Sequence, residues 1–359
     1  MGIDSISPEF TCEAMSEFPS ESPELFFDTI NTLYQSARQL SLISAAVQTG
    51  LFSELEEWHT IDEISKPFPN ADIIRQIILI LVDMNLLQKD GERIKNGPIA
   101  SVYLRKGSPF FQRAYLAKII RHLDDLWLEL PKIIKEGPIR YPEESFFAEL
   151  SLPSMAENAL TGRLQDVVRA VKILPGFKKM RKIIDLGGGH GLYAIALACQ
   201  NPLLKGVVFD LQGVVHLAQE YIDRYGMSNQ VTTMGGDFFL DPIGSQYDII
   251  LSSSNPSGKS PDMLKKIAAA MNINGYFINI QPGDKEAPIN LINDLEWELW
   301  TFEQSEIPKK SWGKKREFIT DSYRNALDEC GLSIVSITEV RDPYVHGFSV
   351  TMLIAQKTR

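Results

Sequence analysis

The sequence predicts an α/β protein in two parts: a doubly wound α/β domain and, before it, a mainly helical domain. From residue 179 onward, short apolar segments typical of strands alternate with segments of helical periodicity. Four glycines between residues 185 and 191 separate the first of these strands from the helix that follows. Residues 24–105 contain three helical segments and then two short strands. These three observations together define the fold class.

The composition is that of a globular protein and excludes several other classes. Of the 359 residues, 44% are hydrophobic and 23% are charged, so the chain can build a sizeable core. The net charge of −10, without long basic runs, argues against a nucleic-acid partner. No apolar run reaches the length of about 18 residues that a membrane span needs. The opening MGIDSISPEF does not have the pattern of a signal peptide.

Cysteine and histidine usage narrows the setting further. The three cysteines, Cys12, Cys199 and Cys330, are too few for a disulfide framework, which favours a reducing, cytoplasmic environment. None of the five histidines has metal-ligand spacing from a second histidine or cysteine, so no metal site is predicted.

The N-terminal domain is expected over residues 24–105, after a flexible arm of residues 1–23 that is rich in Ser, Pro and Glu. A long helix should end at Gly50, and Thr60 with Glu63 has the spacing of a capping box. A third helix is predicted over 71–85. Strands at 86–89 and 93–95 flank a tight turn at Asp90-Gly91. Three helices followed by a hairpin are the outline of a winged helix.

Winged helices often bind DNA, but this one is predicted to serve dimerisation instead. The helix that would enter the groove, in ADIIRQIILILVDMNLL, carries one basic residue, Arg75, and is apolar almost all round. Such a helix is typically buried, here most simply against a partner chain.

The remaining chain is predicted to form a helical connector over residues 106–178 and the α/β domain over 179–359. The connector should be helical at 110–135 and within 146–171. Strands of the α/β domain are expected at 182–185, 206–210, 231–234, 248–252, 276–280, 333–339 and 348–355. Helices are expected at 194–199, 214–225, 261–271 and 321–330.

The glycine-rich loop, Asp185-Leu-Gly-Gly-Gly-His-Gly191, lies between a strand and a helix, where it allows a ligand to approach the backbone closely. Its spacing is neither the dinucleotide pattern nor a Walker loop. A nucleoside cofactor without phosphates fits this spacing better. A tight turn without a ligand is the plainer alternative.

Acidic residues follow the next two strands. Asp210 ends the second strand, 21 positions after Gly189, where a carboxylate can accept bonds from two ribose hydroxyls. Asp237 and Phe238 follow the third strand, where a carboxylate and an aromatic ring can frame an adenine. All three side chains should lie along the carboxyl edge of the sheet, which is where ligands bind in open α/β folds.

These motifs resemble those of the S-adenosylmethionine-dependent methyltransferases of the caffeate and hydroxyindole O-methyltransferase type. The matching text includes IIDLGGGHG, NPLLKGVVFDL, GGDFF and WGKKREF, and also AAVQTGLFSEL and VYLRKGSP near the N-terminus. The similarity covers roughly residues 25–356. It implies a class I, Rossmann-like methyltransferase domain and a winged-helix dimerisation domain. It also implies a homodimer, S-adenosylmethionine as cofactor and a small-molecule methyl acceptor.

The resemblance also assigns cofactor-binding residues. It implies that Gly187 and Gly189 face the tail of the cofactor and that Asp210 holds the ribose, while Asp237 and Phe238 frame the adenine. The set of expected contacts is completed by Leu211 and Ser253.

The sequence departs from the family pattern at the residues that remove a proton from the acceptor. O-methylating members carry a catalytic histidine shortly after the fourth strand, and this position falls at Pro256 or Ser257. The two acidic residues that orient that histidine align with Gln281 and Lys315. Three replacements together predict an acceptor that needs no general base.

A magnitude supports this interpretation. Ionising a phenol with a pKa of about 10 at neutral pH costs roughly 4 kcal/mol, a rate factor on the order of a thousand. A thioether has no proton to lose, so placement in a dry pocket is sufficient. We therefore expect S-methylation of a thioether such as 4-methylthio-2-hydroxybutyrate, in the manner of the S-methyltransferases of dimethylsulfoniopropionate synthesis that resemble this family.

The residues expected to contact the acceptor come from several segments. The carboxylate of such an acceptor should meet a cation, for which Lys315, Arg163 and His122 are candidates. The other expected contacts match family segments that border the acceptor, although each could equally be core packing: Phe147, Met155, Asn158 and Trp297. Aromatic walls would suit a sulfonium product through cation–π contact.

Three alternatives remain open at this stage. A conventional O-methyltransferase could use His122, or a water molecule, as its base. A relative that binds the cofactor without methylating would give no methylated product. A winged-helix regulator would bind DNA in a salt-dependent manner.

Overall fold

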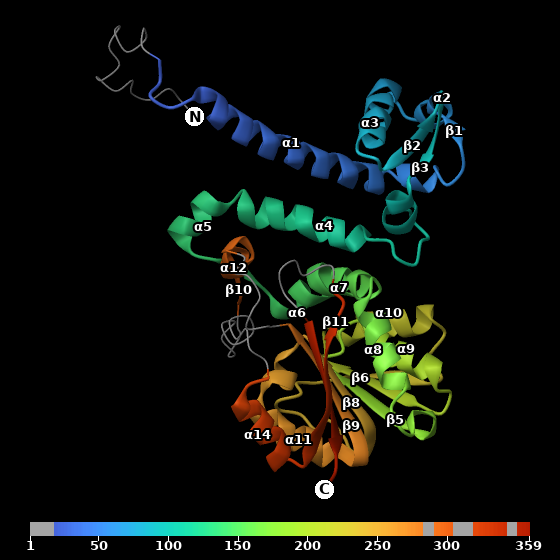
Figure 1. The fold of residues 1–359 in the computed structure, drawn as a ribbon, viewed down its shortest axis with the longest axis vertical. Coiled ribbons are helices and arrows are strands. Elements are labelled where there is room, and N and C mark those ends of the chain that lie inside the picture. The colour runs from blue at the N-terminus through green and yellow to red at the C-terminus, as the bar shows by residue number, and fades with distance from the viewer. Residues whose placement is uncertain (1–17, 283–290, 304–318, 343–349) are drawn as a thin grey trace. The chain divides into compact units, whose positions relative to one another are not determined.

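The computed structural model describes residues 18–282, 291–303, 319–342 and 350–359. These residues form two compact units that divide between Gly97 and Pro98, whereas the sequence had placed the boundary after residue 105. Each unit is built around its own elements (Figure 1).

The first unit holds the predicted helices and hairpin. Its helices are α1 (Pro23–Gln48), η2 (Leu51–Ser53), α2 (Ile61–Ser65) and α3 (Ala71–Asp83). Strands β1 (His59–Thr60), β2 (Leu87–Asp90) and β3 (Arg93–Asn96) form an antiparallel sheet in the order β1-β3-β2.

Local chemistry sets the boundaries of these elements. The predicted capping box is confirmed: Glu63 N donates to Thr60 Oγ1 at 3.2 Å, and Thr60 N donates to Glu63 Oε2 at 2.7 Å. Gly50 and Gly91 adopt positive φ angles of 77° and 58°, which glycine tolerates at the end of a helix and in a tight turn.

The second unit begins with a series of short helices, which include the two segments of the connector that the sequence predicts to be helical. They are η3 (Ala100–Leu104), α4 (Arg113–His122), η4 (Leu123–Trp127), α5 (Leu130–Glu136), α6 (Glu143–Ser145), η5 (Phe146–Ser151), α7 (Leu152–Ala159), α8 (Arg163–Lys172) and η6 (Phe177–Lys179). Of these, η3, η4 and η5 are π-helical, a rare geometry that often occurs near functional sites.

A small parallel pair joins this helical segment to a distant part of the chain. Strand β4 (Ile139–Tyr141) pairs with β10 (Trp300–Phe302), which follows α12 (Leu291–Glu298). The sequence analysis did not predict β4 or β10, because three-residue strands have no readable period.

The main sheet has seven strands, and the fold class predicted from the sequence is confirmed. The strands are β5 (Lys182–Leu186), β6 (Lys205–Asp210), β7 (Val231–Gly235), β8 (Tyr247–Ser253), β9 (Met271–Pro282), β11 (Leu332–Val340) and β12 (Val350–Lys357). Their order is β11-β12-β9-β8-β5-β6-β7. Strands β5 to β9 run parallel, and β12 is antiparallel to both β9 and β11.

Helices cover both faces of this sheet (Figure 1). One face packs against α8, α9 (Leu192–Gln200) and α10 (Val215–Arg224). The other face packs against α11 (Pro261–Ala270) and α14 (Asp321–Glu329), and η7 (Pro256–Lys259) precedes α11. The chain moves from β5 outward to β7 and then returns to β8 beside β5, which creates the switch point where ligands bind in such folds.

None of the helices within the described ranges combines the length and the apolar character needed to cross a bilayer.

Candidate functional site

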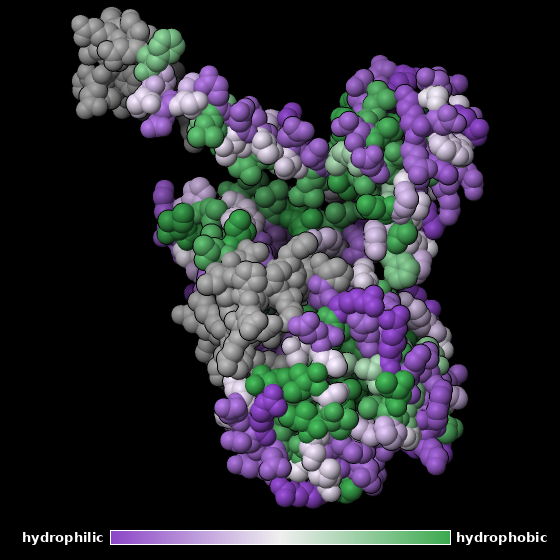
Figure 2. All heavy atoms as spheres, in the orientation of Figure 1, coloured by the Kyte–Doolittle hydropathy of each residue, from purple (hydrophilic) through white to green (hydrophobic). Residues whose placement is uncertain are grey.

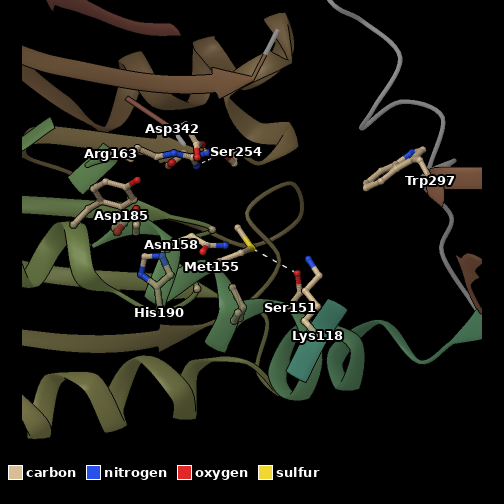
Figure 3. Close-up of a pocket in the computed structure, with 17 residues that line it drawn as sticks. Lys118, Ser151, Met155, Asn158, Arg163, Asp185, His190, Ser254, Trp297 and Asp342 are labelled. Atoms are coloured by element: carbon tan, nitrogen blue, oxygen red, sulfur yellow. Dashed lines mark hydrogen bonds and ion pairs between the residues drawn. The ribbon is translucent and has the colours of Figure 1, made fainter. Parts of the chain in front are cut away.

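A cavity of about 270 Å³ lies at the carboxyl ends of β5 and β8, the switch point of the sheet. Helices α4, α7, α8 and α12 contribute to its wall together with the glycine loop (Figure 3). The lining residues that matter most here are Lys118, Met155, Asn158, Arg163, Asp185, Gly187, Gly189, His190, Tyr193, Ser253, Ser254, Trp297 and Asp342.

The glycine loop requires glycine for two separate reasons. Gly187 and Gly189 have φ angles of 62° and 50°, which side chains rarely tolerate. A Cβ at Gly187 would lie 2.8 Å from Asn255 Nδ2, and one at Gly189 would lie 2.5 Å from a Leu152 methyl carbon. The loop therefore leaves its backbone open to the cavity and packs closely against both neighbours.

Asp210 holds the loop from the neighbouring strand β6. Its carboxylate accepts hydrogen bonds from Gly189 N at 2.7 Å and from Leu211 N at 2.8 Å, through different oxygens. Burial raises the pKa of Asp210 to about 6, although these two main-chain bonds oppose the shift. Each oxygen keeps a second lone pair, which a ligand hydroxyl could use.

Asp237 and Phe238 lie farther along the same edge, after β7. Asp237 Oδ1 accepts a bond from Phe239 N at 2.7 Å, so the carboxylate also shapes its own turn. The rings of Phe238 and Phe239 lie 4.8 Å apart. Burial raises the pKa of Glu143, on α6, and the negative charge of Asp237 adds to this effect.

Asp185 is a cavity residue that the sequence analysis did not single out. It lies on β5, one residue before the strand ends, and is fully buried. Burial, followed by the negative charge of Asp210, raises the pKa of Asp185 to about 8, and a hydrogen bond from the Ala194 main chain opposes this. The sequence could have identified Asp185 as a site residue, because a carboxylate at the end of an apolar strand, just before a run of glycines, is expected at a ligand site.

Arg163, at the start of α8, contributes a charged group to the cavity wall. Its guanidinium forms an ion pair with Asp342 and donates to Ser254 Oγ at 3.0 Å. Figure 3 shows these three side chains grouped together. Ser254 has a φ of 55°, a strained backbone conformation of the kind that functional sites retain. No sequence pattern connects Arg163 with Asp342.

His190 remains neutral within this wall. Burial, together with the positive charge of Arg163, lowers the pKa of His190 to about 3. Its Nδ1 accepts a bond from Leu192 N at 3.1 Å, which places the ring proton on Nε2. The sequence analysis assigned His190 no role.

Two of the three positions that the sequence analysis aligned with the family's proton-handling groups, Ser257 and Gln281, hold neutral side chains, and the third, Lys315, lies outside the described residues. Ser257 is fully buried, and its main-chain N donates to Asn255 Oδ1 at 3.0 Å. Gln281 is also fully buried and donates to Asn255 O at 3.0 Å and to Asn279 Oδ1 at 2.9 Å.

This network ends at Tyr323 of α14, whose hydroxyl accepts from Asn279 Nδ2 at 2.8 Å and donates to Gly258 O at 2.6 Å. Burial raises the pKa of Tyr323 above its ordinary value, so its hydroxyl keeps its proton at neutral pH. The ionisable group of η7 is Lys259, whose pKa is lowered by burial, but Lys259 does not line the cavity.

His122 lies at the end of α4 and is paired with a carboxylate. Its Nδ1 lies 3.1 Å from Glu296 Oε1, and Trp127 Nε1 donates to Glu296 Oε2 at 2.8 Å. Burial works to raise the pKa of Glu296, but these hydrogen bonds lower it overall. Nε2 of His122 is buried and has no hydrogen-bond partner among the described residues.

An aromatic cluster lies beside the cavity and joins η5 to β10. Phe146 and Trp300 stack with centroids 4.3 Å apart, and Phe147 lies 5.6 Å from Phe302. Trp297 contacts Trp300 edge-on at 5.1 Å and also lines the cavity. The β4–β10 pair brings these rings together.

The structure brings some of the predicted site residues together and leaves others outside the cavity wall. Those that line the cavity are Gly187, Gly189, Ser253, Met155, Asn158 and Trp297. Those outside its wall are Asp210, Leu211, Asp237, Phe238, Phe147 and His122. Lys315 lies outside the described residues.

Comparison with known proteins places these features in context. Residues 143–288 match the model of an O-methyltransferase domain family. Acetylserotonin O-methyltransferase of Mus musculus is 31% identical over 277 residues, which is 71% of this chain and 68% of that protein. An uncharacterised protein of Methanocaldococcus jannaschii is 31% identical over 336 residues, 90% of this chain and 89% of the other.

A solved structure shows the same fold over nearly the whole length. The human N-acetylserotonin methyltransferase, determined in complex with S-adenosylmethionine, superposes with a TM-score of 0.65 at 19% identity. The superposition covers 96% of this chain and 100% of that one.

The buried carboxyl of Asp185 predicts a specific pH dependence of stability. Because its pKa is raised in the folded state, the folded protein holds a proton that the unfolded chain releases, and stability falls as pH rises from about 4 to about 8. Asp185→Asn replaces the protonated carboxyl with a neutral amide. The melting temperature of this variant, minus that of the wild type, should therefore grow from pH 4 to pH 8. A difference that is constant across this range would contradict the buried, protonated carboxyl.

Proposed function

Because the chain belongs to the O-methyltransferase family and is an S-adenosylmethionine-dependent methyltransferase of small molecules, we propose that it methylates an acceptor atom that has no proton to lose. The favoured reaction is S-methylation of a thioether acid such as 4-methylthio-2-hydroxybutyrate. The observation that carries this proposal is a pair of buried, neutral residues, Ser257 and Gln281, at the positions where the family's base and one of its acidic partners are expected, both bonded to Asn255.

The residues at the carboxyl edge suit the cofactor. A Cβ at Gly187 or Gly189 would collide with Asn255 or Leu152, so both positions require glycine, and both line the cavity, where a ligand can approach the bare backbone closely. Gly187, Gly189 and Ser253 would hold its amino-acid part. Ribose hydroxyls would bond Asp210 beside Leu211, and the adenine would lie against Asp237 and Phe238. When bound, the cofactor supplies a methyl group on an activated sulfonium.

The cavity offers both apolar and polar contacts for the acceptor. Met155, Trp297 and Leu152 provide apolar lining for a thioether. Asn158 Nδ2 is buried and has no hydrogen-bond partner in the described parts of the chain, so it would gain one from an acceptor oxygen. Arg163 and Lys118 are cations of this wall, and we expect the guanidinium of Arg163 to face the acceptor carboxylate, with Lys315 and His122 as the other candidates.

The proposed reaction needs no general base in the cavity wall. Methylation of a thioether forms a bond from sulfur to carbon and leaves a sulfonium, and no proton is transferred at any step. The protein then needs only to orient the acceptor, exclude water and avoid opposing the positive charge of the product. Aromatic faces such as that of Trp297 favour a sulfonium through cation–π contact.

A methyl-transfer assay with a labelled methyl donor tests this proposal. The acceptor panel pairs thioether acids, including 4-methylthio-2-hydroxybutyrate, with catechols and hydroxyindoles. We expect turnover on a thioether, at a rate that varies little between about pH 7 and pH 9, where phenol ionisation would raise an unassisted rate steeply. Turnover of the phenols alone would contradict S-methylation. Tight cofactor binding without any methylated product would favour a cofactor-binding relative that does not methylate.

A second candidate reaction is O-methylation with a displaced base, and the His122–Glu296 pair favours it. A carboxylate that accepts from Nδ1–H leaves Nε2 as a proton acceptor, which is the arrangement of a general base and its orienting group. His122 lies outside the cavity wall, but Lys118, one helical turn earlier on α4, lines it.

The two reactions make opposite predictions for one variant. If His122 is the base, His122→Asn should lower kcat on a hydroxyl acceptor by about a hundredfold or more, and Glu296→Gln should lower it less. If the acceptor is a thioether, both variants should retain kcat within a few-fold. The measurement is kcat on the best acceptor of the panel, with Arg121→Gln on the exposed face of α4 as the matched control.

We further propose that the chain forms a homodimer through its apolar helices. On α1 the side chains of Leu25, Phe26 and Leu33 are more than half exposed. A run of exposed apolar side chains on one helix is unusual in a monomer and is typical of an interaction surface. Figure 2 shows apolar side chains gathered over α5 as well, where Ile134 is exposed, and Leu128, shortly before α5, is also exposed. The cytoplasmic location stays a prediction.

Replacing Leu25 and Leu33 with glutamate together should convert a dimer to a monomer, because a charged side chain in an apolar interface is not compensated. The measurement is the molar mass by light scattering. Asn31→Glu and Gln35→Glu, on the opposite face of the same helix, are the controls for added charge. A wild type that is monomeric at micromolar concentration would refute the dimer.

A further inference from the structure

Asn255 connects the glycine loop to the end of β8. Its Nδ2 donates to Leu186 O at 2.6 Å, and Leu186 is the last residue of β5 before the loop. Its Oδ1 accepts from Ser257 N at 3.0 Å and from Ser252 Oγ at 3.0 Å. One amide side chain therefore satisfies main-chain groups on both sides of the switch point.

The contact with the loop is steric as well as polar. A Cβ at Gly187 would lie 2.8 Å from Asn255 Nδ2 and 3.0 Å from its Cγ. Gly187 N itself donates to Phe209 O of β6 at 2.8 Å. The path of the loop at Gly187 is thus set on one side by Asn255 and on the other by β6.

The main chain of Asn255 is held from behind by the neutral network. Gln281 Nε2 donates to Asn255 O at 3.0 Å, and Gln281 is fixed in turn by Asn279. Both residues lie on β9 and are fully buried. The preceding residue, Ser254, has a positive φ and bonds to Ile280 O at 2.8 Å.

We propose that Asn255 is a positioning residue, which holds the glycine loop in the shape that binds the cofactor by donating to Leu186 O. It contacts neither the cavity nor, by this proposal, the reacting groups. The buried network behind it, in place of a proton-transfer apparatus, fixes Asn255 and through it the loop. The inference rests on the proposed placement of the cofactor at Gly187 and Gly189.

Two variants remove the donated bond in different ways. Asn255→Ser keeps a side-chain oxygen that can cap Ser257 N but is too short to reach Leu186 O. Asn255→Asp keeps the size and the acceptor, and its ionised carboxylate faces Leu186 O without a proton to donate. A protonated carboxyl at this position would restore the donor, and burial favours the protonated form.

Asn201 offers a matched control. It is fully buried at the opposite edge of the sheet, its Nδ2 donates to Phe177 O at 2.7 Å and Met180 O at 3.0 Å, and its Oδ1 accepts from Leu203 N at 3.0 Å. Asn201→Asp therefore makes the same chemical change in the same kind of bonding pattern, away from the glycine loop.

The experiment is calorimetric titration of the full chain with S-adenosylmethionine, without acceptor, at about pH 6 and about pH 8.5, together with melting temperatures. We expect Asn255→Ser to weaken binding by about tenfold or more at both pH values. For Asn255→Asp, the ratio of its Kd to the wild-type Kd at the same pH should be large at pH 8.5 and several-fold smaller at pH 6. Asn201→Asp should lower the melting temperature and leave the Kd unchanged.

Wild-type affinity in both Asn255 variants, or an equal loss in Asn201→Asp, would overturn the positioning role while leaving the cofactor site in place. A loss in Asn255→Asp that does not depend on pH would show that the donated bond is not the cause. A wild type that does not bind S-adenosylmethionine would overturn the cofactor placement itself, and this inference with it.

Discussion

The glycine loop makes a main-chain hydrogen bond within itself, from Gly191 N to Gly188 O, but the arrangement of the site depends on the neighbours that satisfy its other main-chain groups. Its chain turns through positive φ angles at Gly187 and Gly189, so its main-chain groups point away from any regular ladder. Asp210 accepts from Gly189 N on one side, and Asn255 donates to Leu186 O on the other. Asp210 ends β6 and Asn255 follows the end of β8, and the order β8-β5-β6 places these two strands on either side of β5. The topology of the sheet thus supplies the polar partners of the loop.

The same edge determines which chemistry the site can support. A catalytic base requires a titratable group that faces the acceptor, yet the buried positions behind η7 hold amides and hydroxyls that bond one another. Asp185 and Asp210 are held toward their protonated forms by burial, and His190 is held neutral. Neutral groups lose less free energy than charged groups when water is excluded from a pocket. A pocket without water suits an acceptor that reacts without proton transfer.

The wall on the acceptor side is assembled from segments that are distant in sequence. The β4–β10 pair draws α12 toward η5, and this contact places Trp297 at the cavity and Phe146 against Trp300. The π-helical turn η5 contributes Ser151 to this wall, and its geometry shifts the following side chains relative to a regular helix. His122 and Glu296 meet across the same junction. The acceptor wall therefore depends on contacts between segments that are distant in sequence. The proposed cofactor site, in contrast, lies along the carboxyl edge of a single sheet.

The sequence alone determined the features that depend on short-range physics. Alternating periods located the strands and helices of the α/β domain, the glycine cluster marked a loop that side chains would block, and Thr60 with Glu63 marked a helix start. Each of these is decided within a few residues of chain. Only the tertiary structure decided the pairing of Arg163 with Asp342, the contact of Asn255 with Leu186 and the raised pKa of Asp185. Those properties depend on which strands become neighbours and how much water they exclude, and no local pattern of residues encodes either quantity.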